Sequence, residues 1–137
     1  MENPGNFWRS TGAILGGFLS GAVLSLGTDE LLHRLNVFPP WGQPMADNLF
    51  WIPTVYRLVF NVIGCYFAAR WAPRKPLEHA LVIGALGFFL GLAGTLATWN
   101  HVPPLGPHWY SIIILVSALP CAWLGGFIYL KEKEAAR

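Results

Sequence analysis

The stretch ALVIGALGFFLGLAGTLATWN, residues 80–100, contains no Asp, Glu, Lys or Arg. The stretches 10–28 and 109–130 are also free of these residues, and residues 49–69 contain only Arg57. Each stretch is about 20 residues long, which is the length that a helix rising about 1.5 Å per residue needs to cross a hydrocarbon layer of about 30 Å. The pattern predicts an all-α integral membrane protein with four transmembrane helices.

The composition also favours a lipid environment. Hydrophobic residues make up 54% of the 137 residues and charged residues only 12%, against roughly 25% in an ordinary soluble domain. So few charges cannot cover the surface of a small water-soluble protein. We therefore expect a single domain, residues 1–137, folded as a four-helix bundle with helices at about 11–34, 49–70, 77–100 and 109–131.

The basic residues predict the orientation of the chain in the membrane. Only Arg34 lies in or next to the first and third connections, and the other basic residues flank the spans on the opposite side: Arg9, Arg70, Arg74, Lys75, Lys131, Lys133 and Arg137. By the positive-inside rule, both termini face the cytoplasm, and residues 35–48 and 101–108 face outward. All tryptophans except Trp123 fall at the expected interfaces, where an amphipathic ring is most stable.

Small residues spaced along two spans predict close helix packing. In lipid, helices gain little from hydrophobic burial, so close backbone approach supplies much of the packing energy. The residues concerned are Gly12, Gly16, Gly17, Ser20 and Gly21 in the first span, and Gly84, Gly87, Gly91 and Gly94 in the third.

The two halves of the chain share short patterns. Residues 15–19 (LGGFL) resemble 86–90 (LGFFL), and residues 38–42 (FPPWG) resemble 102–106 (VPPLG). A parallel repeat of two helical hairpins would produce such a pattern. Chance is the alternative, because glycine and proline are frequent in membrane sequences.

Polar residues converge at the outward-facing ends of the spans. Arg57 is the most informative, because it lies about 12 Å inside the second span and a guanidinium in hydrocarbon is costly unless it is paired. We expect its partner to be Asp29 or Glu30. The predicted cluster comprises Asp29, Glu30, His33, Tyr56, Arg57, Trp99, Asn100, His101, His108, Trp109 and Tyr110.

Three interpretations of this cluster remain open. It could be a structural ion pair that joins two helices. It could be a binding site for a small polar or anionic molecule or a lipid headgroup, with Arg57 as the anchor and aromatic side chains as walls. It could also be a metal site formed by His33, His101 and His108 with a carboxylate from Asp29 or Glu30.

Other chemistries find no support in the sequence. No serine stands beside a base in a pattern typical of a nucleophile, so no catalytic residue and no enzyme is predicted. The basic residues are those that the topology requires, and they predict no nucleic-acid partner. Cys65 and Cys121 both lie within spans, where small apolar packing is the expected role. No particular cofactor can be named.

Several motifs resemble an uncharacterised family of small bacterial four-helix inner-membrane proteins. They are GTD (27–29) followed by LH (32–33), VFPPWGQPM (37–45), TWN (98–100) and GPHWY (106–110). The resemblance covers most of the chain and implies a bacterial inner membrane. It supplies no activity, ligand or catalytic residue.

The sequence therefore predicts a small non-enzymatic integral membrane protein. We expect it to associate with itself or to be an accessory subunit of a larger membrane complex, since little of the chain lies outside the bilayer. The alternative is a protein that binds or transports a small ligand, lipid or ion through the outward-facing cluster of acidic, arginine and histidine residues.

Overall fold

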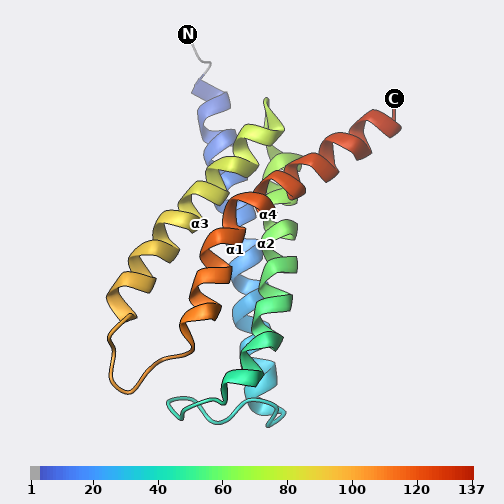
Figure 1. The fold of residues 1–137 in the computed structure, drawn as a ribbon. Coiled ribbons are helices and arrows are strands. Elements are labelled where there is room, and N and C mark those ends of the chain that lie inside the picture. The colour runs from blue at the N-terminus through green and yellow to red at the C-terminus, as the bar shows by residue number, and fades with distance from the viewer. Residues whose placement is uncertain (1–3) are drawn as a thin grey trace.

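A computed structural model describes residues 4–137. Four long helices, and no strand in this range, confirm the predicted all-α four-helix bundle: α1 (Pro4–Arg34), α2 (Trp51–Trp71), α3 (Pro76–Thr98) and α4 (His108–Ala135). A short 3₁₀ turn, η1 (Asp47–Phe50), leads into α2. The α1–α2 and α3–α4 loops lie at one end of the bundle, which we call the loop end. The N- and C-terminal segments and the α2–α3 connection lie at the opposite, terminal end (Figure 1).

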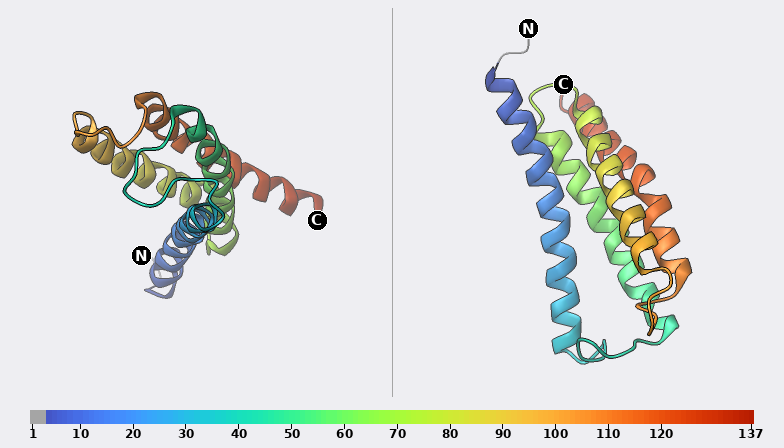
Figure 2. Two further views of the ribbon diagram at one scale, coloured as in Figure 1. Left: turned by 90° about the horizontal axis from the view of Figure 1, so that it is seen from below. Right: turned by 90° about the vertical axis from the view of Figure 1, so that its left-hand side faces the viewer.

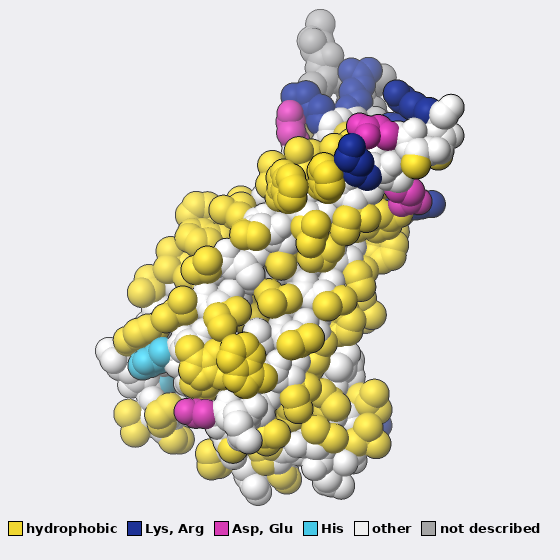
Figure 3. Space-filling view, turned by 45° about the vertical axis from the view of Figure 1, so that its right-hand side comes forward, with side chains coloured by type: hydrophobic (Ala, Val, Ile, Leu, Met, Phe, Trp, Pro, Cys, Tyr) yellow, Lys and Arg dark blue, Asp and Glu magenta, His cyan; other side chains and the backbone are white. Residues whose placement is uncertain are grey.

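The helices suit a membrane protein. All four are long and apolar enough to cross a bilayer. Large apolar side chains such as Phe89, 67% exposed, and Leu96, 69% exposed, point away from the bundle. Figure 3 shows hydrophobic side chains over the middle of the molecule and most Lys and Arg side chains of this face at the terminal end. An apolar exterior of this extent matches lipid better than water.

Two helices extend beyond their predicted bounds. Helix α1 begins at Pro4 instead of about residue 11, because proline is well suited to the first position of a helix. Helix α4 continues to Ala135 instead of about 131. Its last turns include an ion pair between Lys131 and Glu134, 3.1 Å apart, and such i,i+3 pairs stabilise a helix outside the bilayer.

Helix α2 contacts all three other helices, and glycines allow its closest approaches. A Cβ added to Gly64 would lie 2.6 Å from the carbonyl oxygen of Gly17, so α1 and α2 meet backbone to backbone there. Gly125 of α4 packs equally closely on α2, because its added Cβ would lie 2.5 Å from the oxygen of Val62. The chain thus forms two helical hairpins, α1–α2 and α3–α4, joined through α2 (Figure 2, right). The internal repeat itself remains a prediction.

The predicted glycine contacts are confirmed in part. Gly17 and Gly21 of α1 pack against α2, and Gly84 of α3 packs against Ala122 of α4. Gly12 and Gly94 would meet nothing within 4 Å. The spacing of small residues identifies the right helices, but it does not show which part of each stripe meets a neighbour.

We expect Gly64→Ala to destabilise the bundle by about 1–3 kcal/mol, because the new methyl group overlaps the backbone of α1. Gly94→Ala is the matched control, since it places the same methyl group in open space. Circular dichroism during SDS titration in detergent micelles measures both. Equal stability of the two variants would contradict the close α1–α2 contact.

Candidate functional site

The site begins with Asp29, which lies near the C-terminal end of α1 and is only 6% exposed. Its carboxylate accepts a hydrogen bond from Nη2 of Arg57 on one oxygen and from the Tyr56 hydroxyl on the other. Both donors come from α2. The buried carboxylate therefore has a partner for each oxygen, as burial of a charge requires. The contact joins α1 to α2 near the loop end.

Glu30 has a different role from its neighbour Asp29. It accepts a hydrogen bond from Nε of Arg34 at 2.6 Å and from Nε1 of Trp41 at 3.2 Å. Successive residues of a helix point about 100° apart, so only one of the two carboxylates can face α2. The alternatives for the partner of Arg57 are resolved in favour of Asp29.

Asp29 does not saturate Arg57. A guanidinium has five N–H donors, and the contact with Asp29 uses Nη2 alone. Nε is enclosed and has no hydrogen-bond partner among residues 4–137. The side chain as a whole remains 34% exposed. Arg57 therefore retains N–H groups that its contact with Asp29 does not use.

His33 holds the α1–α2 loop in place. Its Nδ1 lies 2.6 Å from the carbonyl oxygen of Pro39, which can only accept, so Nδ1 carries the proton and donates. The imidazole packs against the Trp41 ring with centroids 3.8 Å apart, and its edge meets Phe38, which is 3% exposed. Gly42, with φ +83°, supplies the left-handed conformation that a turn here requires.

A histidine packed against a tryptophan also stabilises the α3–α4 loop. His108 stacks on Trp99 with ring centroids 3.9 Å apart and an interplanar angle of 4°. Its Nε2 donates to the carbonyl oxygen of Trp99 at 3.1 Å. His101, exposed in the loop, donates through Nδ1 to the carbonyl oxygen of Pro103 at 2.8 Å.

The predicted histidine metal site is not formed in the part of the chain that the structure describes. His33, His101 and His108 each donate a hydrogen bond from one ring nitrogen to a carbonyl oxygen of their own loop. In the range 4–137, no group of three His, Cys, Asp or Glu side chains is placed to hold a metal ion. These three histidines stabilise the conformation of the two loops.

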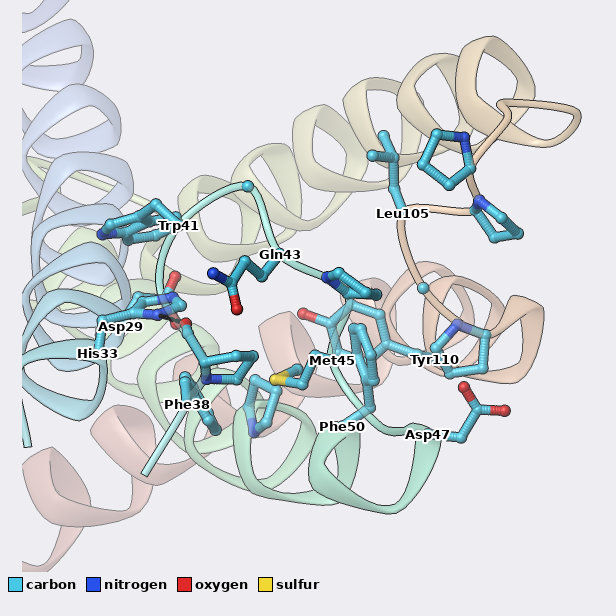
Figure 4. A pocket seen from close by; sticks show the side chains of 18 of the residues that line it. Asp29, His33, Phe38, Trp41, Gln43, Met45, Asp47, Phe50, Leu105 and Tyr110 are labelled. Atoms are coloured by element: carbon cyan, nitrogen blue, oxygen red, sulfur yellow. Dashed lines mark hydrogen bonds between the residues drawn. The ribbon is translucent and has the colours of Figure 1, made fainter. Parts of the chain in front are cut away.

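A cavity of about 780 Å³ lies between the two loops and the helix ends. Figure 4 shows the α1–α2 loop passing across it, with Gln43 and Met45 between Asp29 and His33 on one side and Tyr110 and Leu105 on the other. Six residues of the predicted cluster line it: Asp29, His33, Arg57, Trp99, His108 and Tyr110.

The other five predicted residues do not line this cavity. The Tyr56 hydroxyl donates a hydrogen bond to Asp29, and Glu30 accepts one from Nε1 of Trp41. The Trp109 ring stacks on Trp51 with centroids 4.6 Å apart. The remaining two, Asn100 and His101, are exposed in the loop.

Sequence reasoning missed most of the cavity walls. They come from the two proline-rich loops, from η1 and from the first turn of α2: Phe38, Pro39, Pro40, Trp41, Gly42, Gln43, Pro44, Met45, Asp47, Phe50, Pro53, Pro103, Pro104, Leu105, Gly106 and Pro107. The signal that could have identified the α1–α2 loop is the pair of large aromatic residues in it, Phe38 and Trp41.

A second cavity of about 190 Å³ lies deeper, among all four helices. Its lining includes the polar side chains of Ser25, Arg57 and Asn61. Ser25 lies one helical turn from Asp29, and Asn61 lies one turn from Arg57. Arg57 lines both cavities and therefore stands between them.

No protein-family model, curated protein or solved structure matches the chain. We therefore infer the function of the chain from the geometry and chemistry of the site.

We expect Asp29→Leu to lower the free energy of unfolding by on the order of 3 kcal/mol, because Arg57 would keep its charge without its partner. Asp29→Leu combined with Arg57→Met should recover most of the loss, since no unpaired charge remains. Glu30→Gln is the control and should leave the unfolding midpoint in SDS unchanged. A larger effect of Glu30→Gln than of Asp29→Leu would show that the ion pair is assigned to the wrong carboxylate.

Proposed function

We propose that this protein is an integral membrane protein that binds a small molecule in the cavity at its loop end. The observation that carries the proposal is that Arg57 lines this cavity, remains 34% exposed and contacts Asp29 through Nη2 alone. Small-molecule sites are typically concave spaces of about 300–1,000 Å³ with mostly apolar walls and a few polar groups. The cavity of about 780 Å³ has this size and this kind of lining.

A purely structural ion pair explains less of the geometry. A pair that only joined α1 to α2 would be most stable if neighbouring side chains enclosed it and saturated its donors. Instead, the lining around Arg57 includes the Tyr110 hydroxyl, which forms no hydrogen bond within residues 4–137. Two loops, each held by a histidine, keep the space beside Arg57 open.

Binding, and not catalysis, is the activity that the lining supports. The lining contains no Ser, Thr, Cys or Lys side chain, and the Asp29 carboxylate is already paired with Arg57. The residues that line the cavity therefore offer no typical nucleophile.

Self-association, or membership of a larger membrane complex, is the second candidate. The observation that favours it is the open space at Gly12 of α1 and Gly94 of α3, where an added Cβ would meet nothing within 4 Å. Small residues on lipid-facing helix surfaces allow another helix to approach closely. Binding in the cavity and association through these faces are compatible.

The proposed location is the bacterial inner membrane, with both termini in the cytoplasm. The resemblance to the small inner-membrane family supports the compartment. Basic residues at the terminal end, including Arg70, Arg74 and Lys75, support the orientation. The cavity would then open at the outer side of the membrane.

Native mass spectrometry of the protein, extracted gently from its own membrane, tests the proposed binding. We expect the wild-type chain to retain an added small mass. Gln43→Trp should remove that mass, because the indole would fill the cavity over which Gln43 extends. Gln43→Asn, which keeps the side-chain amide and leaves the space open, is the matched control. A bare wild-type chain, or equal retention by both variants, would contradict binding in this cavity.

Cysteine labelling of intact cells tests the orientation. With Cys65 and Cys121 replaced by alanine, a cysteine at position 43 should react with a membrane-impermeant maleimide. A cysteine at position 75 should react only after the cells are opened. The reverse labelling pattern would invert the proposed topology.

A further inference from the structure

The charges around the cavity restrict what it can bind. Arg57 is the only Lys or Arg among the lining residues, and the Asp29 carboxylate neutralises it. The other charged residue of the lining, Asp47, forms no ion pair within residues 4–137 and is exposed. An anionic ligand would have to compete with Asp29 for Arg57 and would also meet a second carboxylate. The deep end of the cavity therefore favours an uncharged group.

Three polar side chains of the cavity can donate hydrogen bonds to a ligand. Arg57 contacts Asp29 through Nη2 alone and remains 34% exposed, and the hydroxyl of Tyr110 has no hydrogen-bond partner within residues 4–137. The side-chain amide of Gln43 also lacks a partner in the described range and extends over the cavity (Figure 4). A ligand that fits this set carries oxygen atoms that accept hydrogen bonds.

The walls select a flat, apolar body. Rings and a thioether surround the space: Phe38, Trp41, Met45, Phe50 and Trp99. Aromatic faces and methionine sulfur pack favourably against another ring. A flat apolar ring fits between these side chains.

We infer that the ligand is an uncharged, flat ring compound with carbonyl oxygens, the chemistry of membrane quinone headgroups. This inference rests on the proposed function and adds the class of ligand. One carbonyl oxygen accepts hydrogen bonds from Arg57 and the Tyr110 hydroxyl. The ring lies between the aromatic side chains that hold the two loops. Only reversible binding is proposed, with no transfer of electrons.

Isothermal titration with decylubiquinone in maltoside micelles tests the class of ligand. We expect saturable binding of one molecule per chain to the wild type. Tyr110→Phe should weaken binding roughly fivefold, because a single hydrogen bond is lost. The Asp29→Leu, Arg57→Met double variant should weaken it about tenfold or more. Tyr66→Phe removes a hydroxyl at the terminal end and is the matched control, which should bind as the wild type does.

Two results would overturn the inference and leave the proposed function in place. One is equal affinity for decylubiquinone in the wild type, Tyr110→Phe and the double variant. The other is saturable binding of glycerol 3-phosphate or tetramethylammonium, but not of decylubiquinone, by a chain that retains a small mass in native spectra. If the chain retains no mass and binds none of the three probes, both the inference and the proposed function fail.

Discussion

The ion pair between Asp29 and Arg57 determines which faces of α1 and α2 meet near the loop end. A guanidinium at this depth costs several kcal/mol in lipid unless it is paired, so α1 must turn Asp29 toward α2. The Gly17–Gly64 contact lies twelve residues before Asp29 along α1, roughly 18 Å away. Two fixed points at this separation determine both the rotation and the register of the α1–α2 hairpin.

The same hairpin positions the cavity. Once Asp29 faces α2, Glu30 faces outward and holds Trp41, and His33 binds the carbonyl oxygen of Pro39. These contacts fold the α1–α2 loop over the bundle. The second hairpin supplies the opposite wall through the stack of His108 on Trp99. Arg57 therefore belongs both to the residues that stabilise the α1–α2 pair and to those that line the cavity.

The fold could be predicted from the sequence because hydrophobic length determines it. The charge-free stretches predict four spans regardless of tertiary detail. The choice between Asp29 and Glu30 could not be predicted, because it depends on the rotation of α1 relative to α2. The cavity walls were missed because the conformation of the loops depends on tertiary contacts such as His33 with Pro39. Three histidines expected on one side of the membrane suggested a metal, but within residues 4–137 they are not placed to share one.

Arg57 is paired with Asp29 and also lines the cavity. NMR of the protein in nanodiscs with ¹⁵N-labelled arginine measures this at the guanidinium itself, with Arg57→Lys to assign the signal. We expect slow water exchange of the Nη2 protons, which Asp29 binds, in the wild type and in Glu30→Gln, and fast exchange in Asp29→Asn. We also expect a shift of the Arg57 signal when Gln43→Trp fills the cavity. Fast exchange in the wild type, or a loss of protection in Glu30→Gln but not in Asp29→Asn, would contradict the account.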